Sequence, residues 1–158
     1  MASSVGAAVT NLIALIQGAV PSTISGGSVE VAFGELPTYE SPVTLVITEV
    51  TGDQTPAEIG RNFRREETYS IDCQIVTWAG DQDYAKRFTD AVTLWNVVSV
   101  AIANNPWLSV SGVNDATAAV RYAEVGSFSV TPGPDELGQS RCDLEFRVRC
   151  SQRINSLE

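Results

Sequence analysis

The sequence contains no histidine among its 158 residues. This absence removes the commonest general base, the usual partner of a nucleophilic serine or cysteine, and the commonest ligand of a catalytic metal. The patterns GxGxxG, GxxxxGK[ST], CxxC and GxSxG are also missing. The sequence therefore predicts a non-enzymatic protein without a cofactor or a metal site, while chemistry that uses carboxylates alone stays open.

Basic residues are scarce, with ten Lys and Arg against nineteen Asp and Glu, for a formal net charge of −9 at pH 7. Proteins that grip the phosphates of nucleic acid carry a clustered basic excess, so this function is disfavoured. No apolar run reaches the ~18 residues of a membrane span, and the apolar N-terminus lacks a basic segment. We expect one globular domain over residues 1–158, soluble and retained inside the cell.

Only three cysteines are present: Cys73, Cys142 and Cys150. Cys142 and Cys150 lie in one predicted strand, about 27 Å apart at ~3.4 Å per residue, which is too far for a disulfide. Buried free thiols in a reducing cytosol are the expected state, and a disulfide from Cys73 to one of the other two is the alternative.

Two segments, residues 5–20 and 84–102, have the apolar spacing of helices, with Ser3 or Ser4 and then Asp81 as their expected N-terminal caps. The main apolar stripe of the second helix is expected to face the sheet. It consists of Tyr84, Phe88, Ala91, Val92, Trp95, Val98 and Ile102. A second apolar face of this helix needs cover from a neighbouring element or another subunit. That face consists of Leu94, Val97, Val100 and Ala101.

Five segments are predicted strands, two of them with strict alternation of apolar and polar residues. Gly126 is a candidate β-bulge. The resulting order is α-β-β-β-α-β-β, an α+β fold with two main helices packed on a mostly antiparallel sheet. The strands are 29–36, 43–50, 63–78, 119–132 and 141–154.

Residues 51–62, TGDQTPAEIGRN, combine glycines, a proline and no sustained period. They predict a long mobile loop. Loops of this length without secondary structure are uncommon unless they bind a partner, so the segment is a candidate functional loop, or else only the tip of a hairpin.

Four of the ten basic residues fall on the polar side of the last predicted strand: Arg141, Arg147, Arg149 and Arg153. One interpretation is a solvated face on which the arginines pair with carboxylates of the same or the neighbouring strand. The other is a contact with a second copy of the chain, because arginine suits interfacial ion pairs. Trp107, which follows the second helix, is either a core residue or an exposed interface anchor.

Three stretches together resemble the tail terminator (tail completion) proteins of long-tailed bacteriophages. They are the strand RREETYSIDCQIVTW, the helix AKRFTDAVTLWNVVSVAIANNPWL after Gly-Asp, and the closing strand RCDLEFRVRCSQRI. The likeness spans residues 5–154 and depends on order, spacing and length. The segment WLSVSG departs from the Asp-Pro-x-Leu-Gly-Gly turn of relatives and keeps only Pro106 and Leu108.

The resemblance implies a virion protein that forms a hexameric ring at the head-proximal end of the tail tube, assembled in the bacterial cytoplasm. It implies three protein partners: copies of itself, the major tail tube protein and a head–tail connector or neck protein. DNA would pass through the lumen without specific binding, and no membrane is involved.

Candidate contact residues follow from this resemblance. The subunit interface would use Arg141, Arg147, Arg149, Arg153 and Trp107. The tube- or lumen-contacting loop would use Asp53, Gln54, Glu58 and Arg61. The alternatives are a tail tube subunit, a stopper or adaptor ring, a carboxylate-only enzyme, or a stand-alone cytosolic binding module.

Overall fold

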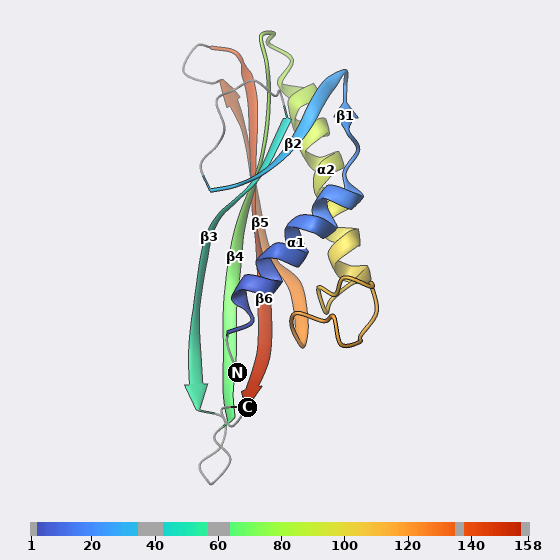
Figure 1. Ribbon diagram of the computed structural model, residues 1–158. Helices are drawn as coiled ribbons and strands as arrows, with labels where there is room; N and C mark the ends of the chain where they lie inside the picture. Colours follow the sequence, from blue (N-terminus) through green and yellow to red (C-terminus); the bar gives the residue numbers. More distant parts are fainter. Residues whose placement is uncertain (1–2, 35–42, 57–63, 135–137, 156–158) are drawn as a thin grey trace.

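The computed structural model describes residues 3–34, 43–56, 64–134 and 138–155 (Figure 1). Two helices pack on one face of a six-stranded sheet, which confirms the α+β class. The predicted order of elements is confirmed, with one short strand, β1, added after the first helix. The elements are α1 (Val5–Ala19), β1 (Thr23–Ile24), β2 (Gly27–Phe33), β3 (Val43–Pro56), β4 (Arg64–Ala79), α2 (Tyr84–Asn104), β5 (Tyr122–Pro134) and β6 (Ser140–Asn155).

The strands lie in the order β1-β2-β3-β4-β6-β5. Every neighbouring pair is antiparallel except β2 and β3, which are parallel. β4 and β6, each 16 residues long, pair along their whole length from Arg64↔Asn155 to Ala79↔Ser140. Figure 1 shows these long strands running the length of the molecule beside both helices. The sheet is therefore mostly antiparallel, as predicted.

The main core lies between the helices and one face of the sheet. Val46 and Val76, on the other face, are also buried. The alternation seen in the sequence is confirmed, because the apolar rows of β4 and β6 are buried and their polar neighbours face the other way. The helices contribute Ala8, Leu12, Ile16, Ala91, Leu94, Val98 and Ile102 to this core. All three cysteines are buried free thiols, so the alternative of a disulfide was wrong.

The buried side of α2 differs from the prediction. Tyr84 and Phe88 are 36% and 43% exposed, whereas Arg87 and Asp90 are each only 5% exposed. The guanidinium of Arg87 donates to the carbonyl of Trp78 (3.4 Å) and lies 3.8 Å from the Asp90 carboxylate. These polar contacts hold Arg87 and Asp90 on the buried side of the first turns of α2. Tyr84 and Phe88 therefore lie on a side of the helix that is open to solvent. The predicted stripe is thus wrong at its N-terminal end.

The predicted caps also change. The side chain of Asp83, and not that of Asp81, caps α2 by accepting a hydrogen bond from the backbone N–H of Lys86 (3.1 Å). Asp81 instead accepts from the hydroxyl of Ser140 (2.6 Å), which ties the start of α2 to β6. Ser4 occupies the N-terminal cap position of α1 without a side-chain capping bond, because its hydroxyl donates to Glu67.

The predicted loop over residues 51–62 is wrong for residues 51–56, which continue β3 and pair with β4. A bulge between Ile47 and Glu49 shifts the alternation by one residue, so the strand pattern is interrupted in the sequence although the strand continues. Gly52 faces Tyr69 so closely that a side chain there would collide with it. The remainder of the predicted loop, with Glu58 and Arg61, lies outside the described residues.

The bulge predicted at Gly126 is confirmed, since the register of β5 and β6 shifts between Val125 and Ser127. The strand predicted over residues 29–36 is β2, which begins at Gly27 and forms a short hairpin with β1. The turn residues of this hairpin, Ser25 and Gly26, have φ of 49° and 78°, which suits a tight two-residue connection. Neither described helix is long and apolar enough to cross a membrane.

Candidate interaction surface on the polar face of the sheet

The second face of the sheet, opposite the helices, is predominantly polar. We call the outward-facing side chains of β2 to β6 the polar face. The described part of this face carries eight carboxylates and four arginines. The carboxylates are Glu30, Glu49, Asp53, Glu66, Asp72, Glu124, Asp143 and Glu145; the arginines are Arg141, Arg147, Arg149 and Arg153. The face is therefore acidic overall, although it holds four of the ten basic residues.

Three of these arginines form ion pairs within the chain. Arg147 bonds Asp72 across strands at 2.8 Å. Arg153 bonds Glu66 at 2.8 Å. Arg141 bonds Asp143 of its own strand at 2.9 Å. Such partly exposed pairs stabilise a fold by at most about 1 kcal/mol each. The interpretation of a locally paired, solvated face thus describes three of the four arginines.

Arg149 forms no ion pair with any residue that the structure describes. Its side chain lies over Gly126, where an added Cβ would be only 2.6 Å from the guanidinium Nε. The bulged glycine of β5 therefore makes room for this arginine. Glu124, the cross-strand neighbour of Arg149, faces the same side without bonding it.

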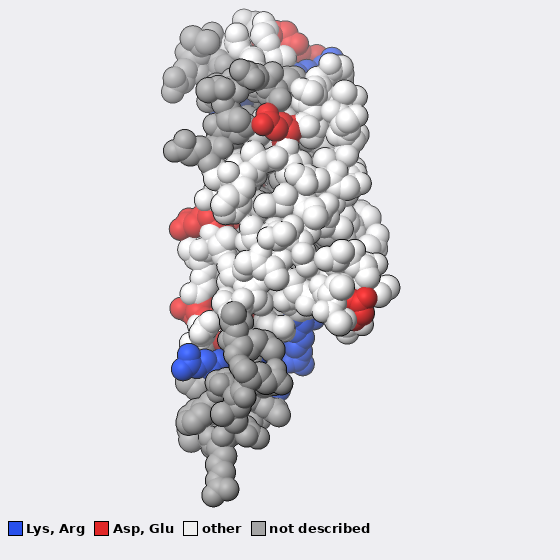
Figure 2. Space-filling view, viewed as in Figure 1, with Lys and Arg blue, Asp and Glu red and all other residues white. Residues whose placement is uncertain are grey.

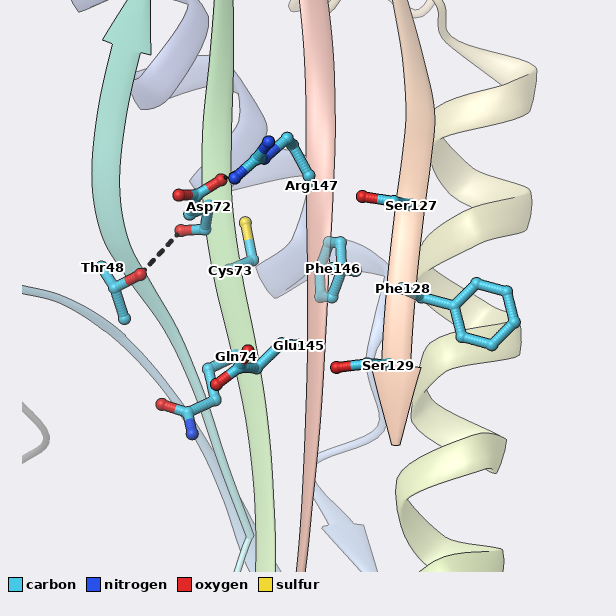
Figure 3. A pocket seen from close by; sticks show the side chains of 10 residues that line it. All are labelled: Thr48, Asp72, Cys73, Gln74, Ser127, Phe128, Ser129, Glu145, Phe146 and Arg147. Carbon is cyan, nitrogen blue, oxygen red and sulfur yellow. Dashed lines mark hydrogen bonds and ion pairs between the residues drawn. The ribbon is translucent and has the colours of Figure 1, made fainter. Parts of the chain in front are cut away.

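Two hollows open onto the polar face. The larger, about 570 Å³, crosses four strands and includes Thr51, Asp53, Ser70, Glu124 and Arg149 in its lining. The smaller, about 310 Å³, lies one row further along (Figure 3). There Asp72 and Arg147 point towards one another, and the hydroxyl of Thr48 donates to the carbonyl of Asp72 (3.2 Å).

Both hollows are wide and open to solvent, and their linings mix polar and apolar surface. Small-molecule sites usually bury most of the ligand against an apolar lining with a few polar groups. The polar face therefore suits contact with a large partner or with solvent better than capture of a small molecule.

The structure brings some of the predicted contact residues together and separates others. Asp53 lines the same hollow as Arg149. Gln54 faces the helix side, where its amide donates to Glu67 Oε2 (2.6 Å). Trp107 is half-buried in the segment after α2, where its carbonyl accepts from the N–H groups of Ala119 and Val120.

Glu67 is a polar residue of the core that the sequence reasoning missed. It is 3% exposed and accepts hydrogen bonds from the N–H and the hydroxyl of Ser4, at 2.8 and 2.7 Å. Burial alone would raise the pKa of this carboxyl, but the bonds from Ser4 and Gln54 outweigh burial and hold the pKa below its usual range. The signal was present in the sequence, because Glu67 occupies a core-facing position two residues before Tyr69.

The cysteines are poorly suited to nucleophilic chemistry. Burial raises the pKa of Cys142 to about 11 and that of Cys150 to about 12. Burial likewise raises the pKa of Cys73. All three thiols are therefore protonated at neutral pH, and the thiolate is the reactive form. No group of three or more Cys, Asp or Glu side chains placed to hold a metal ion occurs in the described ranges.

No family model and no curated protein matches this chain. Among solved structures it is similar to a chain in the virion of a native gene transfer agent (GTA) particle. The sequence identity is 15%, 92% of each chain is covered, and the TM-score is 0.48.

Proposed function

We propose that this chain is a structural virion protein, a ring-forming tail terminator of a phage-type particle. In this role it caps the head-proximal end of the tail tube, stops tube growth and offers a docking surface to the head. The observation that carries the proposal is the acidic polar face, a broad sheet surface that neither helix covers.

A ring has an inner wall, and the polar face is suited to be that wall. Its excess of carboxylates repels the phosphates of DNA and so lets DNA pass without being held. The paired arginines keep the wall hydrated and locally balanced without making it basic. The helices would then form the outer layer. The resemblance in the order and spacing of the elements supports the same role.

The partners in this proposal are further copies of the chain, the tail tube protein and a neck protein of the head. No cofactor is required. A tail tube subunit or another connector ring is the second candidate, because the same acidic face would line its channel.

Electron microscopy of the purified protein with growing tail tubes tests the proposal. We expect single rings from the protein alone, and capped tubes of uniform length when it is added during growth. Tubes that grow unaffected would contradict the terminator role, and long tubes formed by this chain alone would favour a tube subunit.

A further inference from the structure

Exposed apolar side chains gather on one flank of the molecule. Eight large hydrophobic residues are exposed in the described part of the chain, and five of them lie on α2 or β5. We call Phe88 of α2 and Phe128 of β5, together with the half-buried Trp95 that Phe128 contacts, the flank patch. Exposed aromatic rings beside one another on a soluble protein often mark an interaction site.

The centre of the flank patch is continuous with the core. The Phe128 ring is 62% exposed, and its centroid lies 5.6 Å from that of Trp95. Trp95 in turn lies 4.7 Å from Phe146 of the buried row. Figure 3 shows Phe128 directed towards α2, away from Ser127 and Ser129 on the same strand. Phe128 is thus packed against the core through Trp95, which lowers the entropy that its docking would cost.

The flank patch also borders a groove and an unpaired edge. A groove of about 310 Å³ lies between the end of α2 and β5, lined among others by Ile102, Pro106 and Val125. β5 is the last strand in the sheet order, so no described strand pairs with its outer side. An unpaired edge of this kind offers backbone N–H and C=O groups to another chain.

A second surface, around α1, lacks charge altogether. The chain has no charged residue in 1–29 or in 91–114, although nearly a fifth of all its residues are charged. These two stretches pack together, since Asn11 of α1 donates to the carbonyl of Leu108 (2.7 Å). Figure 2 shows this side of the molecule as a broad uncharged surface with charged side chains around its rim.

The exposed side chains of α1 are small, and they border a hollow. Gly6, Ala7 and Ala14 are exposed on the helix. A hollow of about 400 Å³ separates α1 from the segment after α2, and includes Ala14 in its lining. Val110, which also lines it, is 78% exposed. We call this side the α1 face. It presents a recess where the flank patch presents protruding rings.

We propose that the flank patch of one copy docks on the α1 face of the next copy. The inference rests on the proposed function, because it supplies the contact that would close the ring. Two copies that each carry a charge of −9 meet most readily where charge is sparse. The α1 face is uncharged, and the stretches of α2 and β5 around Trp95 and Phe128, residues 91–104 and 125–134, contain no charged residue.

The two surfaces differ, so the contact is heterologous. Heterologous contacts propagate from copy to copy and close into rings, whereas a self-complementary contact stops at a dimer. α1 packs against α2 and β2, while the flank patch lies on the side of α2 next to β5. One copy can therefore engage two neighbours at once.

Two variants, each removing one surface, test the inference. Phe88→Glu with Phe128→Glu places charges in the flank patch, and Ala14→Glu with Ala7→Glu places them on the α1 face. All four positions are exposed, so both variants should fold, as circular dichroism and thermal unfolding would verify. Ser129→Glu is the matched control, since it adds charge to the polar side of the same strand.

Size is measured by sedimentation velocity and native mass spectrometry over a range of concentrations. We expect the wild-type chain and Ser129→Glu to assemble, and each surface variant to associate more than about tenfold more weakly, because unpaired charge would be buried. An equimolar mixture of the two surface variants should form dimers and nothing larger. In that mixture one intact flank patch meets one intact α1 face, and both remaining surfaces are blocked.

Unchanged assembly of either surface variant would overturn the inference, as would a mixture that stays monomeric or a wild-type chain that is monomeric at millimolar concentration. Variants that still form rings but no longer cap tubes would assign the flank patch to the tube protein and also overturn it. Rings that assemble by another surface and still cap tubes would remove this inference and leave the proposed function standing.

Discussion

At the scale of single residues, Glu67 shows how a carboxylate can stabilise a core that is otherwise apolar. Its oxygens accept from Ser4 at the start of α1 and from Gln54 of β3. Three separate elements therefore meet at one side chain. The N-terminus of a helix also favours a negative charge nearby, which adds to the same effect. Glutamine, which is neutral and has the same shape, would keep the packing and lose only the stabilisation that depends on the negative charge.

We predict that Glu67→Gln lowers the free energy of unfolding by about 1–3 kcal/mol at pH 7. The pKa of Glu67 is lowered from its ordinary value of 4.5 in the folded chain. Its contribution is therefore complete above that ordinary value and is lost as the pH falls through the lowered pKa. Urea unfolding of both proteins between about pH 3 and pH 7 measures this. A difference between them that stays constant over that range would contradict the assignment.

Residue-scale patterns predicted much of the fold, and their failures have physical causes. The strict alternation around Cys73 and Phe146 gave β4 and β6 with the correct buried faces. The end of β3 was lost because its bulge breaks the period, and an extended strand with Gly and Pro then reads as loop. The face of α2 was misjudged because Arg87 and Asp90 are buried through polar contacts that hydrophobic periodicity does not register.

At the scale of elements, the structure gives ion-pair partners among the described residues to three of the four arginines of β6, and none to Arg149. The sequence correctly placed all four on one face, since that follows from the period of two. It could not assign their partners, which depend on the register of β4 and β5 against β6. The contact of these arginines with a second copy stays a prediction, and Arg149 is the member whose charge no described carboxylate pairs.

We predict different effects for two substitutions on this face. Arg147→Ala should lower the free energy of unfolding by up to about 1 kcal/mol, because it breaks the pair with Asp72. Arg149→Ala should change it by less than about 0.5 kcal/mol, because no described ion pair is lost. Thermal or urea unfolding gives both values. Equal losses would mean that the pair with Asp72 contributes nothing measurable.

The charge-reversed double variant Arg147→Glu with Arg149→Glu then separates the two interpretations of the face. Both side chains point away from the core, so the chain should remain folded. Rings that survive this change place the arginines on a solvated wall. Rings that are lost while the fold persists place them in a contact between copies.

At the scale of the whole molecule, charge is sorted by layer. The helix layer contains the two uncharged stretches, and the opposite side of the sheet carries most of the described charge. A single chain in solution gains little from this separation. A closed assembly gains an outer or lateral surface for contacts and an inner surface for DNA, which is why the sorting supports a virion role.

We predict that the assembled wild-type protein does not retain duplex DNA at physiological salt. Replacing Glu49, Asp53 and Glu124 by Lys should create measurable binding that weakens steeply with salt, because a basic polar face can then replace the counterions of DNA. Fluorescence anisotropy with labelled duplex measures it. Changing Thr10, Gln17 and Asn96 to Lys adds the same number of lysines at exposed helix positions away from the face, and equal binding by that control would contradict the role of the polar face.

The pairing of β4 with β6 has a consequence for biosynthesis. These neighbours in the middle of the sheet are separated in the chain by α2 and β5, so their ladder is built from contacts distant in sequence. Long-range pairing of this kind slows folding, and here it must wait for the last strand to leave the ribosome. A nascent chain lacking β6 would have β5 separated from β4, so subunits become competent for assembly only after β6 has been synthesised.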